Sequence, residues 1–245
     1  MIDVPQPFID GLKSLQVELE PGELDRLASF LDLLLAANEK MNLTAIKDHD
    51  IAWQRHLLDS LSLLPLLRAA EAGRVLDLGS GGGLPGLPLA ITMPDVEFML
   101  LEATTKKAKY LEETAQALGC ANVSVLDERA EIVGEPGCLH REAWDAVTAR
   151  AVGPMPVLLE LTVPLLKVGG VVLAIKGERA EEELRAAGEA MDVLCCDVIE
   201  RRRTSTGTIV VIEKQGVTSA DYPRRPGEPK RNPIGSPPAK PRKRR

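Results

Sequence analysis

A glycine-rich turn between two apolar runs holds the first residues whose types and spacing could do chemistry. In the sequence VLDLGSGGGLPGLPLAI, residues 75–91, five glycines lie between Gly79 and Gly86, and the acid Asp77 precedes them. Glycine lacks a Cβ atom, so its backbone can bend sharply and lie close to a ligand. A turn of this kind between a strand and a helix is typical of a nucleotide site at the edge of an α/β sheet.

Two classes of cofactor compete for this turn. Gly81, Gly83 and Gly86 match GxGxxG, the dinucleotide fingerprint in which a helix N-terminus binds a pyrophosphate. Pro85 interrupts that pattern, and Asp77 would repel a phosphate but attract the ammonium group of an amino-acid-like ligand. The residues therefore favour S-adenosylmethionine, while an NAD-dependent oxidoreductase is the alternative enzyme. A turn that merely packs a helix closely is a third explanation.

Acids and small residues also follow the next two apolar runs. Glu102 lies 25 residues after Asp77, and a carboxylate there can accept both hydroxyls of a ribose. Because NAD and S-adenosylmethionine share a ribose, Glu102 indicates only a nucleoside. Ala130 and Glu131 could flank an adenine through a backbone N–H and a side chain, although a solvated helix start would explain them equally well.

A regular alternation of strands and helices would bring these residues to one edge of a sheet. Helical spacing is predicted over residues 106–119, 156–167 and 181–191. Short apolar runs predict strands at residues 74–79, 96–102, 123–127, 144–150 and 170–177. This order predicts an α/β fold with a mostly parallel sheet and helices on both faces.

Two more apolar runs, residues 193–200 and 208–214, have no helical segment between them. They predict an antiparallel hairpin at the edge of the sheet, which brings the number of strands to seven. Residues 71–216 would form this domain.

Residues 1–70 have helical patterns and no strand signal, so they predict a helical extension before the sheet. One helix face is marked by leucines at steps of three and four residues, and a second pattern covers about residues 50–67. At the other end, residues 217–245 are basic and rich in proline. From Tyr222 onward the chain is almost without apolar residues, and we expect it to be extended or disordered.

The net charge of −6 is unevenly distributed along the chain. Residues 222–245 hold nine Lys and Arg against one acid, whereas the remainder holds 21 against 35. A basic segment on an acidic body could contact RNA phosphates, although a solvated tail explains the same charges. The candidate phosphate contacts in the tail are Arg224, Arg225, Lys230, Arg231 and residues 242–245.

Several other classes of protein are disfavoured. The four cysteines have no CxxC spacing and the histidines do not cluster, so we expect no metal site. No uncharged apolar run approaches 18 residues and no signal peptide is evident, so we expect no membrane partner and a cytoplasmic location.

The sequence also limits which methyl acceptors fit a methyl donor. Exocyclic amino groups commonly require a [DN]PP[YF] signature after the fourth strand, where this chain has TARAVGP. Methylation at a pyrimidine carbon requires a cysteine nucleophile, and the four cysteines, which follow a helix, lie in a loop or lie in the late edge strand, are not expected beside the cofactor. An acceptor that is already nucleophilic, such as a ring nitrogen, remains.

Eight short motifs in a fixed order resemble one family. They are MNLTAI (41–46), RHLLDS (55–60), DLGSGGGLPGLPLAI (77–91), EATTKK (102–107), ERAE (128–131), ARAVGP (149–154), AIKG (174–177) and YPRRPGEP (222–229). Together they resemble the ribosomal RNA small subunit methyltransferase G family, also called the glucose-inhibited division protein B family, over about residues 35–229. The resemblance implies a class I, Rossmann-like S-adenosylmethionine-dependent methyltransferase fold with an N-terminal helical extension. It also implies methyl transfer to N7 of one guanine in 16S rRNA.

The resemblance also implies roles for particular residues. The cofactor-binding candidates, with Asp77 and Gly81 added from the turn itself, are Asp77, Gly79, Gly81, Leu84, Glu102, Ala103, Thr104, Ala130, Glu131 and Arg150. His56 and Arg150 are candidates for positioning the base, and Arg55 and Lys176 for contacting RNA. Two of these residues have a structural alternative: a packed or partly exposed side chain for His56 and a solvated strand end for Lys176.

Guanine N7 has an in-plane lone pair and no proton, so its methylation needs no general base. Alignment of the reactants and exclusion of water can supply most of the catalysis. We therefore expect no indispensable proton-transfer residue. The expected partner is 16S rRNA or the small ribosomal subunit, and we expect a monomer. A non-catalytic RNA-binding or regulatory protein on the same fold is the alternative from another class.

Overall fold

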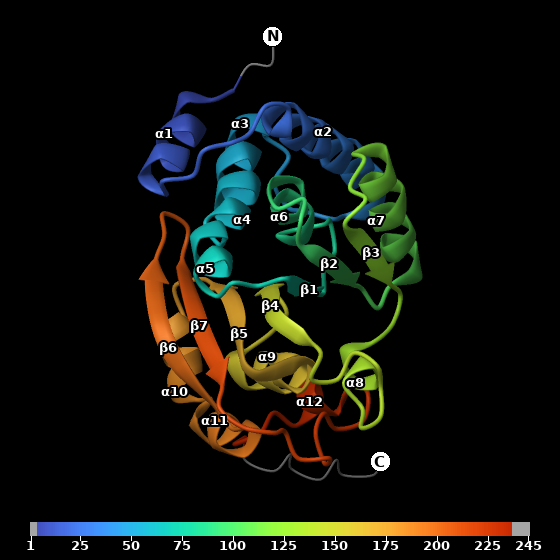
Figure 1. Ribbon diagram of the computed structural model, residues 1–245, viewed down its shortest axis with the longest axis vertical. Helices are drawn as coiled ribbons and strands as arrows, with labels where there is room; N and C mark the ends of the chain where they lie inside the picture. Colours follow the sequence, from blue (N-terminus) through green and yellow to red (C-terminus); the bar gives the residue numbers. More distant parts are fainter. Residues whose placement is uncertain (1–3, 237–245) are drawn as a thin grey trace, which may run out of the picture.

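The computed structural model describes residues 4–236, and a seven-stranded sheet runs through its centre (Figure 1). The strands lie in the order β3-β2-β1-β4-β5-β7-β6. β1 to β5 are parallel, whereas β7 is antiparallel to both of its neighbours. The bounds are Arg74–Leu78 (β1), Glu97–Leu101 (β2), Val123–Leu126 (β3), Trp144–Arg150 (β4), Leu166–Lys176 (β5), Cys196–Arg203 (β6) and Thr208–Lys214 (β7). The predicted sheet with its antiparallel edge hairpin is confirmed.

Helices cover both faces of the sheet, so the central strands are buried on two sides. Val75 packs into the core beneath the N-terminal helices, α6 and α7, while its neighbour Leu76 packs into the core beneath α8 to α11. This two-sided burial explains why the strands have continuous apolar sequences rather than alternating ones. The bounds are Gly86–Thr92 (α6), Thr105–Ala117 (α7), Ala130–Val133 (α8), Met155–Thr162 (α9), Ala180–Arg185 (α10) and Gly188–Leu194 (α11).

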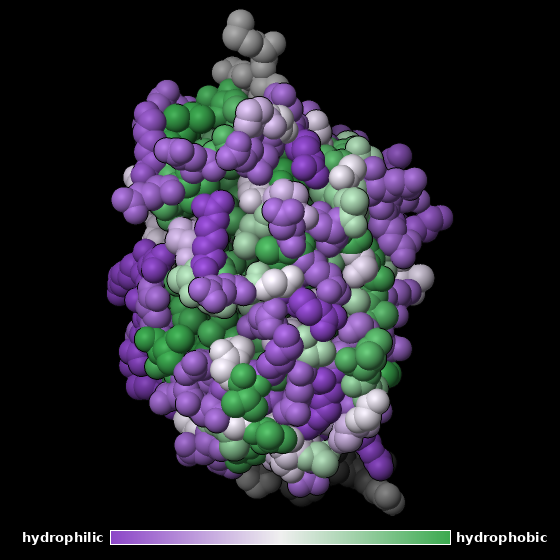
Figure 2. Space-filling view, viewed as in Figure 1, coloured by the Kyte–Doolittle hydropathy of each residue, from purple (hydrophilic) through white to green (hydrophobic). Residues whose placement is uncertain are grey.

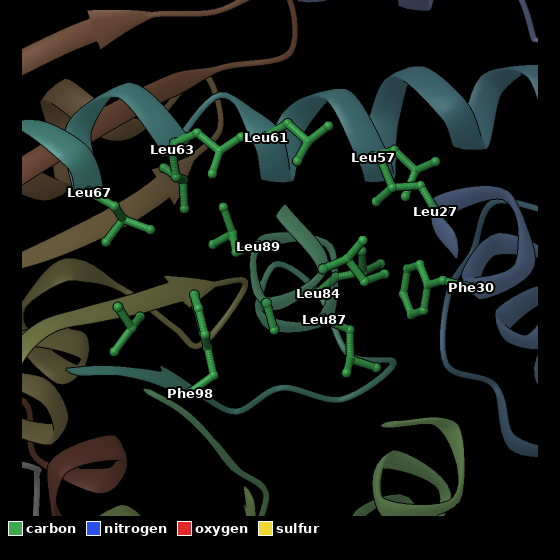
Figure 3. Packing of buried hydrophobic residues seen from close by; sticks show 14 of the residues in the cluster. Leu27, Phe30, Leu57, Leu61, Leu63, Leu67, Leu84, Leu87, Leu89 and Phe98 are labelled. Atoms are coloured by element: carbon green, nitrogen blue, oxygen red, sulfur yellow. The ribbon is translucent and has the colours of Figure 1, made fainter. Parts of the chain in front are cut away.

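The N-terminal helices share a core with the sheet domain. Their bounds are Gln6–Ser14 (α1), Glu23–Met41 (α2), His49–Ala52 (α3), Trp53–Leu58 (the π-helix η1), Asp59–Leu61 (α4) and Leu64–Ala69 (α5). Figure 3 shows Phe30 and Leu57 from this extension beside Leu84 and Leu87 from the glycine-rich turn and α6. The extension is therefore anchored directly to the element that follows β1. Within residues 4–236, no helix has the length and apolar content needed to cross a bilayer.

Three predicted helices differ from the structure. The one predicted over residues 50–67 is divided among α3, η1, α4 and α5. The one predicted over residues 156–167 ends at Thr162, because Pro164 has no N–H to continue it, and a short 3-10 turn leads into β5. The one predicted over residues 181–191 is divided into α10 and α11 near Gly188, and α11 extends to Leu194, so β6 begins at Cys196.

The prediction of an extended or disordered tail is wrong for its described part. The segment from Thr218 to Ser236 packs across α8 and α9 and contains the short helix α12, Glu228–Arg231 (Figure 1). Its anchor is Arg224, whose guanidinium donates to the fully buried carboxylate of Glu160 at 2.6 and 2.8 Å. Composition suggested disorder because the segment is almost without apolar residues, but polar contacts with the body hold it in place. Residues 242–245 lie outside the described residues.

Replacing Arg224 with alanine should destabilise the protein strongly. Among the residues that the structure describes, the change leaves the buried Glu160 carboxylate with only the backbone N–H of residue 224, which lies 2.9 Å away. Removing one partner of a buried ion pair typically costs about 3–5 kcal/mol. Urea unfolding should therefore give a free energy lower by about 3 kcal/mol for Arg224→Ala. The neighbouring Arg225 is exposed, and Arg225→Ala should stay within about 0.5 kcal/mol of wild type. Equal effects of the two substitutions would contradict the anchoring role.

Candidate functional site

The candidate site lies at the carboxyl ends of β1 and β4, where the connections from two neighbouring strands leave on opposite faces of the sheet. These strands are neighbours, but β1 leads into α6 on one face and β4 leads into α9 on the other. Ligands of open α/β sheets bind in the crevice that such a divergence leaves. The predicted residues Gly79, Glu102, Ala130 and Arg150 all lie at this edge, at or just after the ends of their strands.

Asp77 lies beneath the glycine-rich turn rather than on its surface. Its side chain is fully buried, Oδ1 accepts a hydrogen bond from Thr148 Oγ1 at 2.8 Å, and Oδ2 accepts the Gly86 N–H at 3.2 Å. A Cβ atom at Gly86 would lie 2.8 Å from that carboxylate oxygen, so glycine is required for this close approach. The sequence suggested that Asp77 could meet a ligand ammonium group directly. The structure instead places its carboxylate where it holds the turn, α6 and β4 together.

This arrangement leaves no site for a pyrophosphate at the start of α6. The N–H of Gly86, the first residue of the helix, already donates a hydrogen bond to the Asp77 carboxylate. The turn's own N–H groups at Gly79, Ser80 and Gly83 donate to backbone carbonyls instead of pointing outward. A dinucleotide site needs free N–H groups and a positive helix end at this position. The geometry therefore argues against the NAD alternative.

Glu102 is held in place by two backbone groups. Its Oε2 accepts the Gly81 N–H at 3.0 Å, and its Oε1 accepts the Thr104 N–H at 2.8 Å. Each carboxylate oxygen can accept a second hydrogen bond, so two further donors, such as a pair of vicinal hydroxyls, can be satisfied. Ala103 and Thr104 follow it and are exposed. The predicted ribose acceptor is thus a fixed carboxylate.

A cleft of about 150 Å³ opens beside Glu102 between the ends of β1, β2 and β3. Its lining residues are Leu78, Gly79, Leu101, Ala103, Glu128, Arg129, Ala130, Glu131 and Leu161. The volume is below the roughly 300–1,000 Å³ of pockets that enclose a whole drug-sized ligand, so the cleft suits one planar base rather than a complete nucleoside. Four of these residues, Gly79, Ala103, Ala130 and Glu131, were predicted from the sequence.

Sequence reasoning missed the apolar walls of the cleft. Leu78 and Leu101 are the last residues of β1 and β2, and their position at strand ends was a usable signal. Leu161 comes from α9, which approaches the cleft from a distant part of the chain, and no local motif marks it.

Glu131 joins this cleft to the C-terminal segment. Its Oε1 accepts hydrogen bonds from Arg129 Nη2 and from the Gly227 N–H, both at 2.7 Å. Burial opposes ionisation of Glu131, but these donors outweigh it and hold its pKa below the usual range. The carboxylate predicted to touch an adenine thus also fixes the segment that carries α12 against the cleft wall.

Arg150 and His56 lie together at the mouth of the crevice. Burial lowers the pKa of Arg150, while the carboxylates of Asp59 and Asp77 oppose that change. Its Nη1 donates to the backbone carbonyl of Arg55 at 3.1 Å. The position brings the end of β4 against the π-helix η1, a type of element that often marks functional sites.

His56 is a neutral, buried histidine. Its exposed fraction is 4%, and its Nδ1 lies 3.1 Å from the Arg55 carbonyl and must donate to it. Nε2 then accepts from Thr44 Oγ1 at 2.8 Å, which joins the MNLTAI and RHLLDS motifs in space. Burial, with Arg150 nearby, lowers the His56 pKa to about 4. The side chain is therefore uncharged near neutral pH, and the sequence did not indicate its partner Thr44.

The predicted RNA contacts are not equally accessible. Arg55 is exposed, and so are Arg225, Lys230 and Arg231 near α12. Lys176 is buried, donates to the Gly153 carbonyl and pairs with Glu183 at 2.8 Å. Arg224 is committed to Glu160, as described above. The structure therefore gives Lys176 and Arg224 internal partners and leaves the other four basic side chains at the surface.

Comparisons with known proteins agree with this geometry. Residues 23–206 match the model of the GidB family, rRNA small subunit methyltransferase G. The chain is 47% identical to ribosomal RNA small subunit methyltransferase G of Sorangium cellulosum, over 90% of this chain and 92% of the relative. It is 42% identical to the protein of that name from Deinococcus radiodurans, over 91% and 90%.

Solved structures share the fold at low identity. A methyltransferase from Geobacter sulfurreducens has a TM-score of 0.55 at 13% identity, covering 86% of this chain and 98% of that one. The O-methyltransferase TomG from Streptomyces achromogenes, solved in complex with SAM, has a TM-score of 0.51 at 17% identity, covering 76% and 90%. These likenesses show the class I methyltransferase fold.

The burial of Asp77 predicts an unusual pH dependence of stability. Desolvation raises its pKa from 3.8 to about 6, so the folded protein binds this proton more tightly than the unfolded chain. The stabilising contribution is complete below the unfolded pKa and is lost as pH rises to the folded value. In Asp77→Asn, the amide oxygen can accept the Gly86 N–H and the amide NH2 can donate to the Thr148 hydroxyl, and the side chain does not ionise.

Urea unfolding of both proteins at two pH values checks this expectation. Between pH 5 and pH 8, wild type should lose about 1.5 kcal/mol of unfolding free energy relative to Asp77→Asn. Asp95→Asn, which removes an exposed carboxylate in the turn before β2, is the control. Parallel pH profiles for wild type and Asp77→Asn would show that Asp77 is not the buried acid described here.

Proposed function

Because the chain belongs to the GidB family of rRNA small subunit methyltransferase G, we propose that it methylates N7 of a guanine in 16S rRNA with S-adenosylmethionine as the donor. Methyl transfer from S-adenosylmethionine to small-subunit ribosomal RNA is the activity of this family. The observation that best supports the activity in this chain is the glycine-rich turn held between two carboxylates, beside a cleft of the size of a base. An rRNA substrate agrees with the expected cytoplasmic location.

The residues at the carboxyl ends of β1 to β3 fit a nucleoside. The fixed Glu102 carboxylate has two free acceptor positions for the ribose hydroxyls, and the cleft bounded by Ala103, Ala130 and Leu161 would hold the adenine. Leu84 packs its side chain into the apolar core, so a contact from this residue would come from its backbone (Figure 3). When bound, S-adenosylmethionine supplies an electrophilic methyl group on a cationic sulfur.

The buried Asp77 would act on the donor at a distance. Its carboxylate lies under the turn, so it can favour the cationic ammonium and sulfonium groups electrostatically without direct contact. It also holds the end of the turn that contains Gly79, whose φ of 69° glycine adopts readily, while Glu102 holds Gly81 through its N–H. We propose that these two glycines let the donor lie against bare backbone.

The chain needs to position the guanine but not to remove a proton from it. His56 is uncharged and both of its ring nitrogens are engaged, so it would act by shaping the mouth of the site. Arg150 is held by the Arg55 carbonyl and lies near Asp59 and Asp77, where it could donate to the guanine or to its phosphate. Methylation makes the guanine cationic, and the nearby carboxylate of Asp59 would favour that charge. The chemistry would thus depend on alignment.

Ligand-dependent melting separates the two cofactor classes. S-adenosylhomocysteine should raise the melting temperature, because a ligand that binds only the folded state stabilises it by RT ln(1 + [L]/Kd). NADH should have no effect, since Asp77 already occupies the start of α6. Stabilisation by NADH alone would overturn the assignment.

Glu102→Ala should weaken S-adenosylhomocysteine binding by roughly 10- to 100-fold, because hydrogen bonds to a charged group are worth about 1.5–3 kcal/mol. Glu97→Ala is a matched control, since Glu97 begins the same strand and its partly exposed carboxylate pairs with Arg74. Isothermal titration calorimetry would measure both, and equal affinities for the two variants would remove the ribose role from Glu102.

The modified position can be mapped on 16S rRNA. After incubation with the protein and labelled donor, borohydride and aniline should cleave the RNA at one N7-methylguanine, which reverse transcription would locate as a stop. Both naked 16S rRNA and isolated small subunits should be offered as substrates. Binding of RNA without transfer to either substrate would favour the non-catalytic alternative.

A further inference from the structure

A groove at the same edge of the sheet lies next to the candidate site but on the side away from the cofactor residues. Its volume is about 660 Å³. It runs between the turn that joins β6 to β7 and the segment after β5, and η1 contributes one residue to it. Its lining includes Arg55, Arg201, Arg203 and the turn residues Thr204, Ser205 and Thr206, together with the acids Glu178 and Glu181.

The strand order explains how the groove is related to the methyl-transfer centre. Along the sheet edge, β3, β2 and β1 carry the cofactor residues, β4 carries Arg150, and β5, β7 and β6 border the groove. Two contacts connect the groove to the centre: the Arg55 carbonyl accepts from Arg150, and Thr206 Oγ1 donates to Asp59. Figure 1 shows the tip of the β6–β7 hairpin beside α4, which begins at Asp59.

Two arginines of the groove form no ion pair with a carboxylate of the described residues. Arg201 pairs with Glu181 at 3.3 Å, and Arg202 pairs with Glu200 at 2.8 Å. Among residues 4–236, by contrast, no carboxylate forms an ion pair with Arg55 or Arg203, and both are exposed. The left edge of the molecule in Figure 2, where β6 runs in Figure 1, is strongly hydrophilic.

The chemistry of these side chains fits an RNA backbone. Guanidinium groups and hydroxyls are the side-chain groups that most often contact phosphate and sugar oxygens in nucleic acids. Ser205 adds an exposed hydroxyl to the groove, while the Thr204 hydroxyl accepts N–H groups of the hairpin turn and the Thr206 hydroxyl donates to Asp59. The body of the protein is acidic, so a nucleic acid must be met by a local group of positive charges rather than by the general field.

We propose that this groove binds the phosphate backbone of the substrate RNA beside the target guanine, with Arg55 and Arg203 as the phosphate contacts. The proposal rests on the proposed function for the identity of the RNA, and it adds where the strand lies. In this arrangement the RNA approaches from the β6–β7 hairpin, and the target base reaches Arg150 from the side opposite the adenine cleft. The Asp59–Thr206 contact would keep the hairpin at a fixed distance from the centre.

Charge-neutralising variants test the groove. Arg55→Gln, Arg203→Gln and the double variant are compared with Arg68→Gln, which removes an exposed arginine from α5, before the start of β1 at the opposite edge of the sheet. The measurement is the affinity for naked 16S rRNA, in the presence of S-adenosylhomocysteine, at several potassium chloride concentrations. Melting temperatures with and without S-adenosylhomocysteine verify that each variant is folded and binds the ligand.

Each phosphate contact contributes about 0.7 to the slope of log affinity against log salt for single-stranded nucleic acid. Each single variant should therefore lose about 0.7 of that slope and bind roughly fivefold more weakly at 0.1 M salt. The KM for 16S rRNA in methyl transfer should rise by a similar factor. Arg68→Gln should match wild type within about twofold.

The other results are equally informative. Unchanged affinity and slope in both single variants would overturn the groove, even if wild type methylates 16S rRNA normally. A defect seen on assembled small subunits but not on naked rRNA would also overturn it, because the groove would then bind a ribosomal protein. If wild type transfers no methyl group to either substrate, the proposed function fails, and the binding data still decide whether the groove holds RNA.

Discussion

The buried carboxylate of Asp77 is the contact on which the rest of the site depends. It joins three elements: it lies on β1 one residue before the end of the strand, accepts the first N–H of α6 and accepts the hydroxyl of Thr148 on β4. Because the carboxylate is fully buried, its ionisation is unfavourable, and burial raises its pKa. The hydroxyl of Thr148, the N–H of Gly86 and the proximity of Arg150 partly offset the effect of burial. The turn above it is therefore held in a form that an apolar residue at this position could not maintain.

The same contact decides what kind of ligand the turn can take. A negative charge at the start of α6 repels a diphosphate and favours a cation. A turn whose sequence matches GxGxxG can therefore bind a sulfonium nucleoside instead of a dinucleotide. Glu102 repeats the arrangement one strand further along, where its carboxylate is fixed by the N–H groups of Gly81 and Thr104. The two carboxylates thus anchor the turn from both sides and leave acceptor capacity for a ribose.

Segments from both ends of the chain complete the edge of the sheet. The N-terminal extension brings η1, with Arg55 and His56, to the end of β4, and the C-terminal segment is fixed to the cleft wall by Glu131 and Glu160. A buried ion pair such as Arg224–Glu160 compensates for the lack of apolar residues in that segment. The edge is therefore divided in two: nucleoside-binding groups over β1 to β3, and exposed arginines and hydroxyls over β5, β7 and β6.

The sequence by itself determined which segments form strands and which form helices, the helical extension, the glycine-rich turn and the acids at strand ends. Each of these depends on local spacing that a strand or helix repeats. It also indicated the family through eight ordered motifs. It misjudged the tail from Tyr222 to Ser236 and the accessibility of Lys176 and Arg224, and it did not indicate that Asp77 is buried beneath the turn. It gave no signal for Leu161 in the cleft or for Thr44 beside His56. Only the tertiary structure decided these points, because each depends on contacts between residues distant in the chain, such as Glu160 with Arg224 and Arg150 with Arg55, and local spacing does not encode such pairings.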